Sequence, residues 1–149
     1  MEPPAYAAFH AIAAAAVDRQ RQPSPRFYRN VARDDAHHEL LFWCPDVPHP
    51  LRFGDGRTFW SLSLVVGRVD AAAAADVLHV LNTVHTRNVL DRWTLAKSNN
   101  LIWSMWAPYA RGQPPTLDDI EMVAAIAFLA AGELLERMAD AGIRVAVET

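Results

Sequence analysis

Histidine, cysteine and acidic side chains are the groups in this sequence that could do chemistry. His37, His38 and Glu39 are consecutive, and imidazole and carboxylate groups are ordinary ligands of zinc. His38 can share a strand face with Cys44, but six residues of strand separate the two by roughly 20 Å. One metal ion cannot bridge that gap. We therefore expect polar residues at the entrance to a strand here, and no bound metal.

Three further candidates have ordinary structural explanations. His79 and His85 lie six residues apart, which turns them to different faces of a helix. His85 can instead meet Asn82 on one helix surface, as a polar contact. Cys44 stands in the apolar sequence LLFWCPD, a setting that raises the pKa of a thiol and makes it unreactive.

Catalytic motifs are missing from the sequence. It contains no Gly-x-Ser-x-Gly nucleophile elbow, no phosphate-binding loop and no Gly-x-Gly-x-x-Gly dinucleotide motif. The acidic pairs at 34–35 and 118–119 fall in a turn and at a helix start, unlike an acid/base pair in a dry cleft. The sequence predicts a protein that is not an enzyme and carries no cofactor.

A basic cluster near the N-terminus offers an alternative function. Arg26, Arg29 and Arg33, preceded by Arg19 and Arg21, alternate with Phe27 and Tyr28, as in surfaces that bind single-stranded nucleic acid by stacking. The acidic residues at 34, 35 and 39 follow at once and cancel much of this charge. A solvated edge strand is the favoured interpretation, and single-stranded nucleic-acid binding is the alternative.

Composition describes an ordinary globular chain. Its 149 residues are 52% hydrophobic and 21% charged, with a net charge of −3 and a single cysteine. This length predicts one domain over residues 1–149. The N-terminus lacks the basic region of a signal peptide, and the run from Met122 to Gly132 is shorter than the ~20 residues that cross a bilayer. We expect a cytoplasmic protein without a membrane segment.

Hydrophobic spacing predicts the helices and strands outside the central hairpin. Helices are expected over residues 5–21, over 71–86 with Asp70 as N-cap, and from a Thr116 cap to about residue 141 with Gly142 as the stop. Strands are expected over 26–33, 38–44 and 58–67. The Pro- and Gly-rich segment 45–57 is expected to be a loop or an irregular hairpin.

The central hairpin is predicted from two strands, 90–97 and 101–106, joined by a two-residue turn at Asn99-Asn100. Such a turn places Trp93 opposite Trp106, and any even-numbered turn keeps the same two faces. Both faces are then apolar, so each must be covered. One face carries Trp93, Leu95, Ile102 and Trp106, and the other carries Leu101, Trp103 and Met105.

These elements predict an α+β fold. The expected order is α-β-β-β-α-β-β-α, with one antiparallel sheet faced by helices, because short connections between consecutive strands favour antiparallel pairing.

The same order, together with the sequence of residues 78–138, resembles the YbjN family, whose fold is that of type III secretion chaperones. The features that carry the resemblance are a helix end with Asn82 and His85, the hairpin from Trp93 to Trp106, and a long closing helix introduced by Thr116. The resemblance implies a small non-enzymatic protein that dimerises and binds another protein, often as an extended segment laid over the sheet or a helix.

A chaperone-like, homodimeric adaptor is therefore the leading hypothesis, with an unidentified protein as its second partner. The closing helix has a second apolar side at Met122, Ile126 and Leu129, and we expect another part of the chain or a second protein to pack against it. Aromatic residues and Met are enriched where proteins dock. The predicted interface residues are Trp93, Trp103, Met105 and Trp106 on the hairpin, and Val77, Val80, Leu81 and Val84 on the helix before it.

Overall fold

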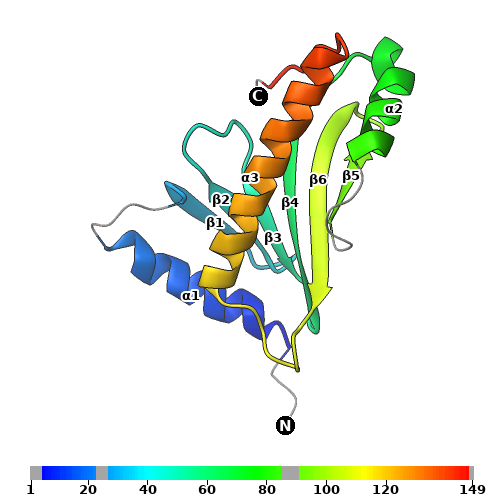
Figure 1. Ribbon diagram of the computed structural model, residues 1–149. Coiled ribbons are helices and arrows are strands. Elements are labelled where there is room, and N and C mark those ends of the chain that lie inside the picture. The colour runs from blue at the N-terminus through cyan, green and yellow to red at the C-terminus, as the bar shows by residue number, and fades with distance from the viewer. Residues whose placement is uncertain (1–4, 23–26, 85–90, 148–149) are drawn as a thin grey trace.

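A computed structural model describes residues 5–22, 27–84 and 91–147. Within them the chain has an α+β fold, with a six-stranded antiparallel sheet of strand order β1-β2-β3-β4-β6-β5 and three α-helices (Figure 1). The elements are α1 (Ala7–Gln20), β1 (Asn30–Asp34), β2 (Glu39–Trp43), β3 (Leu51–Asp55), β4 (Phe59–Arg68), the 3-10 helix η1 (Ala71–Ala73), α2 (Ala74–Val84), β5 (Asp91–Leu95), β6 (Asn100–Pro108) and α3 (Leu117–Asp140).

The helices lie on one side of the sheet, and the hydrophobic core fills the space between the two layers. Figure 1 shows α1 and α3 crossing this side, with α2 beside β5. The strands send every second side chain into the core, as period-two alternation requires. Its largest fully buried members include Trp103, Phe42 and Phe53 from the strands and Ile120 and Leu134 from α3.

The strand β3 was missed by the sequence prediction, which placed residues 45–57 in a loop or irregular hairpin. The observed order is therefore α-β-β-β-β-α-β-β-α. Leu51 and Phe53 are fully buried and pair with Leu64 and Leu62 of β4. The strand is five residues long and is bounded by Pro50 and Gly56, so turn-forming residues conceal its short alternation.

Both ends of α3 follow the sequence prediction. The Thr116 hydroxyl accepts a hydrogen bond from the Asp119 amide at 3.3 Å, and the Asp119 carboxylate accepts one from the Thr116 amide at 2.8 Å. This reciprocal pair satisfies amides at the start of the helix. At the other end Gly142 has φ +75°, and the Ile143 amide donates to the Met138 carbonyl at 2.8 Å. That pattern is a Schellman ending.

The start of α1 is held by a buried carboxylate from β3. The Phe9 amide donates to Asp55 Oδ2 at 2.8 Å, and the Tyr109 hydroxyl donates to Asp55 Oδ1 at 2.6 Å. Helix N-termini carry free amides that favour a negative charge, which explains why Asp55 is tolerated in the core. The predicted helix over 5–21 is confirmed within two residues at its start, although Val17 is exposed rather than part of its buried side.

The start of α2 differs from the prediction. Asp70 occupies the N-cap position, but its side chain makes no capping hydrogen bond, and the first turn is the 3-10 helix η1. In that tighter turn the Ala73 amide donates to the Asp70 carbonyl at 3.0 Å. The end of the predicted helix 71–86 lies outside the described residues.

The hairpin of β5 and β6 has a three-residue turn, so the predicted two-residue turn is wrong. Lys97 to Asn99 form the turn, with Asn99 at φ 65°, and the Ala96 amide donates to the Asn100 carbonyl at 2.9 Å. An odd-numbered turn shifts the register, which places Trp93 opposite Trp103 and not Trp106. One hairpin face is therefore core, and the other faces away from the helices.

No helix in the described ranges combines the length and the apolar character that a bilayer crossing requires.

Candidate functional site

The side of the sheet that faces away from the helices is the most distinctive surface of the molecule, and we call it the open face. Every strand residue on this side is exposed or half-buried in the described chain, in contrast to the buried residues that alternate with them. Its residues on three of the strands are Leu41 and Trp43 from β2, Phe59, Ser61, Ser63 and Val65 from β4, and Ile102, Ser104 and Trp106 from β6.

Two aromatic rings mark one end of the open face. Phe59 and Trp106 lie 5.3 Å apart between ring centroids at an interplanar angle of 43°. They remain 40% and 56% exposed. Aromatic pairs at this separation attract each other. Mutual contact therefore keeps both rings in place without removing them from water.

Small side chains form the middle of the open face on β4 and β6, between the exposed Arg52 of β3 and Arg92 of β5. Ser63 pairs with Ser104, and Ser61 pairs with Trp106, across β4 and β6. On the neighbouring strand β3, a Cβ atom added to Gly54 would lie 2.9 Å from Ser61 Oγ, which leaves no room for a larger residue there. The face thus has a low, polar floor beside its aromatic end.

The other end of the open face is apolar. Val65 pairs with Ile102 across β4 and β6, and Trp43 on β2 is 40% exposed. This arrangement is suited to binding a chain segment of another protein. The backbone of the segment could approach closely over the small serine side chains, and its apolar side chains could contact the open face at both ends.

The predicted interface residues fall mostly in the core. Trp103, Met105, Val77, Val80 and Leu81 are all buried within the chain itself, so their assignment to a surface is wrong. The physical reason is that the helices cover the sheet face that carries Trp103 and Met105. Helix α2 also packs against α3 and β5, which buries Val77, Val80 and Leu81.

Only one predicted interface residue is fully open to solvent. Trp106 is exposed, whereas Trp93 and Val84 are half-buried and pack against the core. The indole of Trp103 donates from Nε1 to Asp91 Oδ2 at 3.2 Å, which satisfies its polar atom inside the sheet.

Phe59 and Val65 were missed as surface residues, whereas Ser61 and Ser63 were expected opposite the apolar side of their strand. The signal was present in the alternation of residues 58–67, which predicted the buried side of that strand correctly with Trp60, Leu62 and Leu64. The opposite side of the same strand is by necessity the open face. Its pairing with β6, however, depends on tertiary contacts that the local pattern does not contain.

A second exposed apolar surface runs along the outside of α3, and we call it the α3 stripe. Met122, Ile126 and Leu129 are 62%, 43% and 72% exposed. The small residues Ala125 and Gly132 lie beside them and are also exposed. This surface agrees with the second apolar side that the sequence predicted for the helix.

The basic cluster does not form a common stacking surface in the described residues. Arg19 forms ion pairs with Asp118 at 2.8 Å and with Glu121. Arg33 pairs with Asp35 at 2.7 Å and stands over the Phe9 ring.

The aromatic residues of that region are also engaged. Tyr28 is fully buried and its hydroxyl donates to the Ala16 carbonyl at 2.8 Å, while Phe27 packs on Phe42. Arg29 is exposed, and Arg26 lies outside the described residues. This geometry gives no support to the nucleic-acid alternative.

The candidate reactive residues are scattered. Cys44 is buried, and burial raises the pKa of its thiol to about 11, as its apolar sequence predicted. His79 is exposed on α2, and His85 lies outside the described residues. The ring of His38 stacks on Tyr6 at 3.4 Å between centroids. His38 and Cys44 therefore take separate structural roles.

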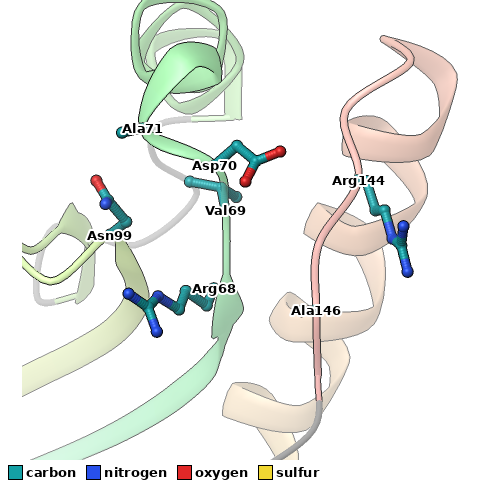
Figure 2. Close-up of a pocket in the computed structure, with 7 residues that line it drawn as sticks. All are labelled: Arg68, Val69, Asp70, Ala71, Asn99, Arg144 and Ala146. Carbon is teal, nitrogen blue, oxygen red and sulfur yellow. The ribbon is translucent and has the colours of Figure 1, made fainter.

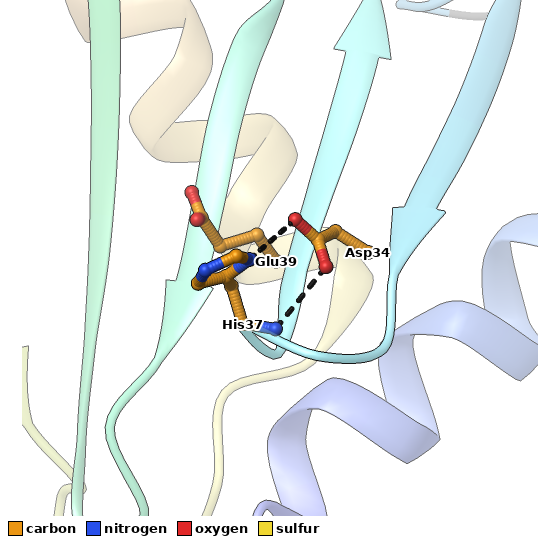
Figure 3. Close-up of side chains that lie close together, drawn as sticks. All are labelled: Asp34, His37 and Glu39. Carbon is orange, nitrogen blue, oxygen red and sulfur yellow. Dashed lines mark hydrogen bonds and ion pairs between the residues drawn. The ribbon is translucent and has the colours of Figure 1, made fainter.

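One cluster of titratable groups was not predicted as a set. The turn between β1 and β2 brings Asp34, His37 and Glu39 together, and their ligand atoms all lie within 4.8 Å of one another (Figure 3). His37 Nδ1 contacts Asp34 Oδ2 at 2.8 Å, and the His37 amide donates to Asp34 Oδ1 at 3.1 Å. These two contacts hold the pKa of Asp34 below its ordinary value.

A polar recess of about 510 Å³ lies where β4, the hairpin turn and the C-terminal segment meet (Figure 2). Arg68, Asp70, Asn99 and Arg144 line it. Figure 2 shows the guanidinium groups of Arg68 and Arg144 on opposite sides, pointing away from each other. They do not converge on one anion, so the recess is not a built binding site.

Comparison with known proteins finds no family model and no curated protein that matches this chain. The resemblance to the YbjN family stays a prediction.

Proposed function

We propose that the protein is a non-enzymatic, chaperone-like adaptor that forms a homodimer and binds another protein on its open face. The observation that carries this proposal is the exposed pair Phe59 and Trp106 at the edge of a serine floor. Large aromatic side chains held at a surface are typical of the residues that contribute most to protein–protein binding.

An extended segment of the partner fits the open face better than a flat protein surface does. The serine hydroxyls at 61, 63 and 104 offer donors and acceptors to a backbone that lies over them. Apolar side chains of the segment would then contact Phe59 and Trp106 at one end and Val65 and Ile102 at the other. Such a binding mode agrees with the resemblance to type III secretion chaperones.

The α3 stripe supports the homodimer. An exposed apolar row on a 24-residue helix is suited to a two-fold contact with the same row of a second copy. Gly132 and Ala125 would let the two helices approach closely. In an antiparallel pair centred between Ile126 and Leu129, each of these side chains meets the other one on the partner copy.

The same arrangement sets Asp118 of one copy level with Arg137 of the other, because 118 and 137 have the same midpoint along α3 as 126 and 129. It also sets Asp119 level with Glu136, and Asp118 already pairs with Arg19, so the apolar contact and not charge carries the proposed dimer. The α3 stripe lies on the helix side of the sheet, so this dimer leaves both open faces turned outward and available.

A cytoplasmic, non-catalytic role is consistent with the remaining groups. Cys44 is a buried thiol with a raised pKa, which suits a reducing compartment and an unreactive residue.

Affinity capture from a lysate of the source organism tests the proposed function. The wild-type protein, Trp106→Ala and Leu78→Ala are used as baits, and the retained proteins are quantified by mass spectrometry. Leu78 is a matched control because it is an exposed apolar residue on α2, away from the open face. We expect one or more proteins that wild type and Leu78→Ala retain and Trp106→Ala loses. Identical sets from all three baits would contradict binding on the open face.

A further inference from the structure

The turn between β1 and β2 presents three potential metal ligands of two chemical kinds. Asp34 is the last residue of β1, Glu39 is the first residue of β2, and His37 lies in the turn between them. Each side chain offers one ligand atom, and the three atoms lie within 4.8 Å of one another. Imidazole with two carboxylates is a ligand set used for zinc and related divalent ions.

The charges of this turn are arranged in a way that a cation would relieve. Asp34 and Glu39 are direct partners across the antiparallel pair, and like charges in that position destabilise a sheet. Arg52 binds one oxygen of Glu39 at 2.8 Å, which leaves the second oxygen for another ligand. The His37 ring contacts Asp34 and has Glu39 close by (Figure 3).

We propose that Asp34, His37 and Glu39 bind a divalent transition-metal ion such as Zn²⁺. Ligand atoms around a tetrahedral zinc ion lie about 3.4 Å apart, given bond lengths near 2.0–2.2 Å. Of the three side chains His37 is exposed and Asp34 and Glu39 are half-buried, and rotation about their side-chain bonds would close the remaining gap. Water completes the coordination, because the turn is open to solvent.

A bound ion would also affect the residues that hold the start of α1 against the sheet. His38 follows His37 directly, and its positive φ of 54° fixes the shape of the turn. Its carbonyl accepts from the Asp55 amide at 3.0 Å, and its ring stacks on Tyr6 at the start of α1. Binding at the turn would therefore stabilise the position of the first helix. This inference is independent of the proposed function on the open face.

Calorimetric titration of Zn²⁺ into the metal-free protein, without a histidine tag, tests the site. Wild type should show one saturable site, and His37→Ala should weaken the affinity at least tenfold. His79→Ala is the matched control, since it also removes an exposed histidine but one that lies outside the cluster of Asp34, His37 and Glu39. It should bind as wild type does.

A second readout uses Co²⁺, whose visible absorption reports coordination by protein ligands directly. Wild type and His79→Ala should give the same absorption, and Asp34→Asn and His37→Ala should lose it. Absence of saturable Zn²⁺ binding by the folded wild-type protein would overturn the proposal. Equal loss of affinity in His37→Ala and His79→Ala would overturn it as well.

Discussion

At the scale of single residues, Trp103 and Trp106 show how the direction of a side chain decides whether it is buried or exposed. They are three residues apart on β6, yet one is 1% exposed and the other 56%. Trp103 pairs with Trp93 and Leu64 inside the core, and Trp106 contacts Phe59 on the open face. The same residue type is therefore part of the core in one position and, in the proposed function, a recognition residue in the other.

The two tryptophans give a matched test of this assignment. Trp103→Ala should lower the free energy of unfolding by about 3–5 kcal/mol, as large-to-small changes in a core do. Trp106→Ala should lower it by only about 0.5–1.5 kcal/mol, because the exposed Trp106 ring loses little more than its contact with Phe59. Urea denaturation followed by circular dichroism measures both. A loss of stability in Trp106→Ala as large as that in Trp103→Ala would mean that the open face is part of a core.

At the scale of elements, the sequence predicted most helices and strands but not the register of the hairpin. The ends of α3 were predictable because Thr116 and Gly142 act through local hydrogen bonds. The turn at Asn99 was located correctly, but its length was not. An Asn-Asn pair fits a two-residue turn and a three-residue turn alike, and one residue of difference exchanges the faces of Trp93 and its neighbours.

The strand β3 was not predicted, for a different reason. Its alternation spans only Leu51 to Asp55, and Asp55 is an acidic residue in a core position. Local hydrophobicity cannot reveal that the start of α1 and the Tyr109 hydroxyl provide partners for this carboxylate. The contacts that make Asp55 acceptable are 46 and 54 residues away in the sequence.

The proposed dimer contact on the α3 stripe can be tested by a single substitution. Leu129→Glu places a charge at the centre of the proposed two-fold contact and should convert a dimer into a monomer in size-exclusion chromatography with light scattering. Leu78→Glu is the control, because Leu78 is an exposed leucine on a different helix. It should remain dimeric. A monomeric wild type, or a dimer that Leu129→Glu leaves intact, would contradict the assignment of this stripe.

At the scale of the whole molecule, the layered fold separates two apolar surfaces. The core lies between the helices and the sheet, the α3 stripe is the exposed side of α3, and the open face lies on the other side of the sheet. The two surfaces share no residues, so the proposed dimer contact and the proposed partner site do not overlap. The net charge of −3 gives no strong field that would attract nucleic acid.

The affinity for a partner recovered by capture tests whether the open face binds another protein. Calorimetry compares wild type, Trp106→Ala and Leu129→Glu for binding to that partner. Trp106→Ala should weaken binding by roughly 30-fold, the loss of about 2 kcal/mol that is usual for an aromatic residue central to an interface. Leu129→Glu should bind the partner with the same affinity per chain as the wild-type protein does. Unchanged affinity in Trp106→Ala would contradict recognition on the open face.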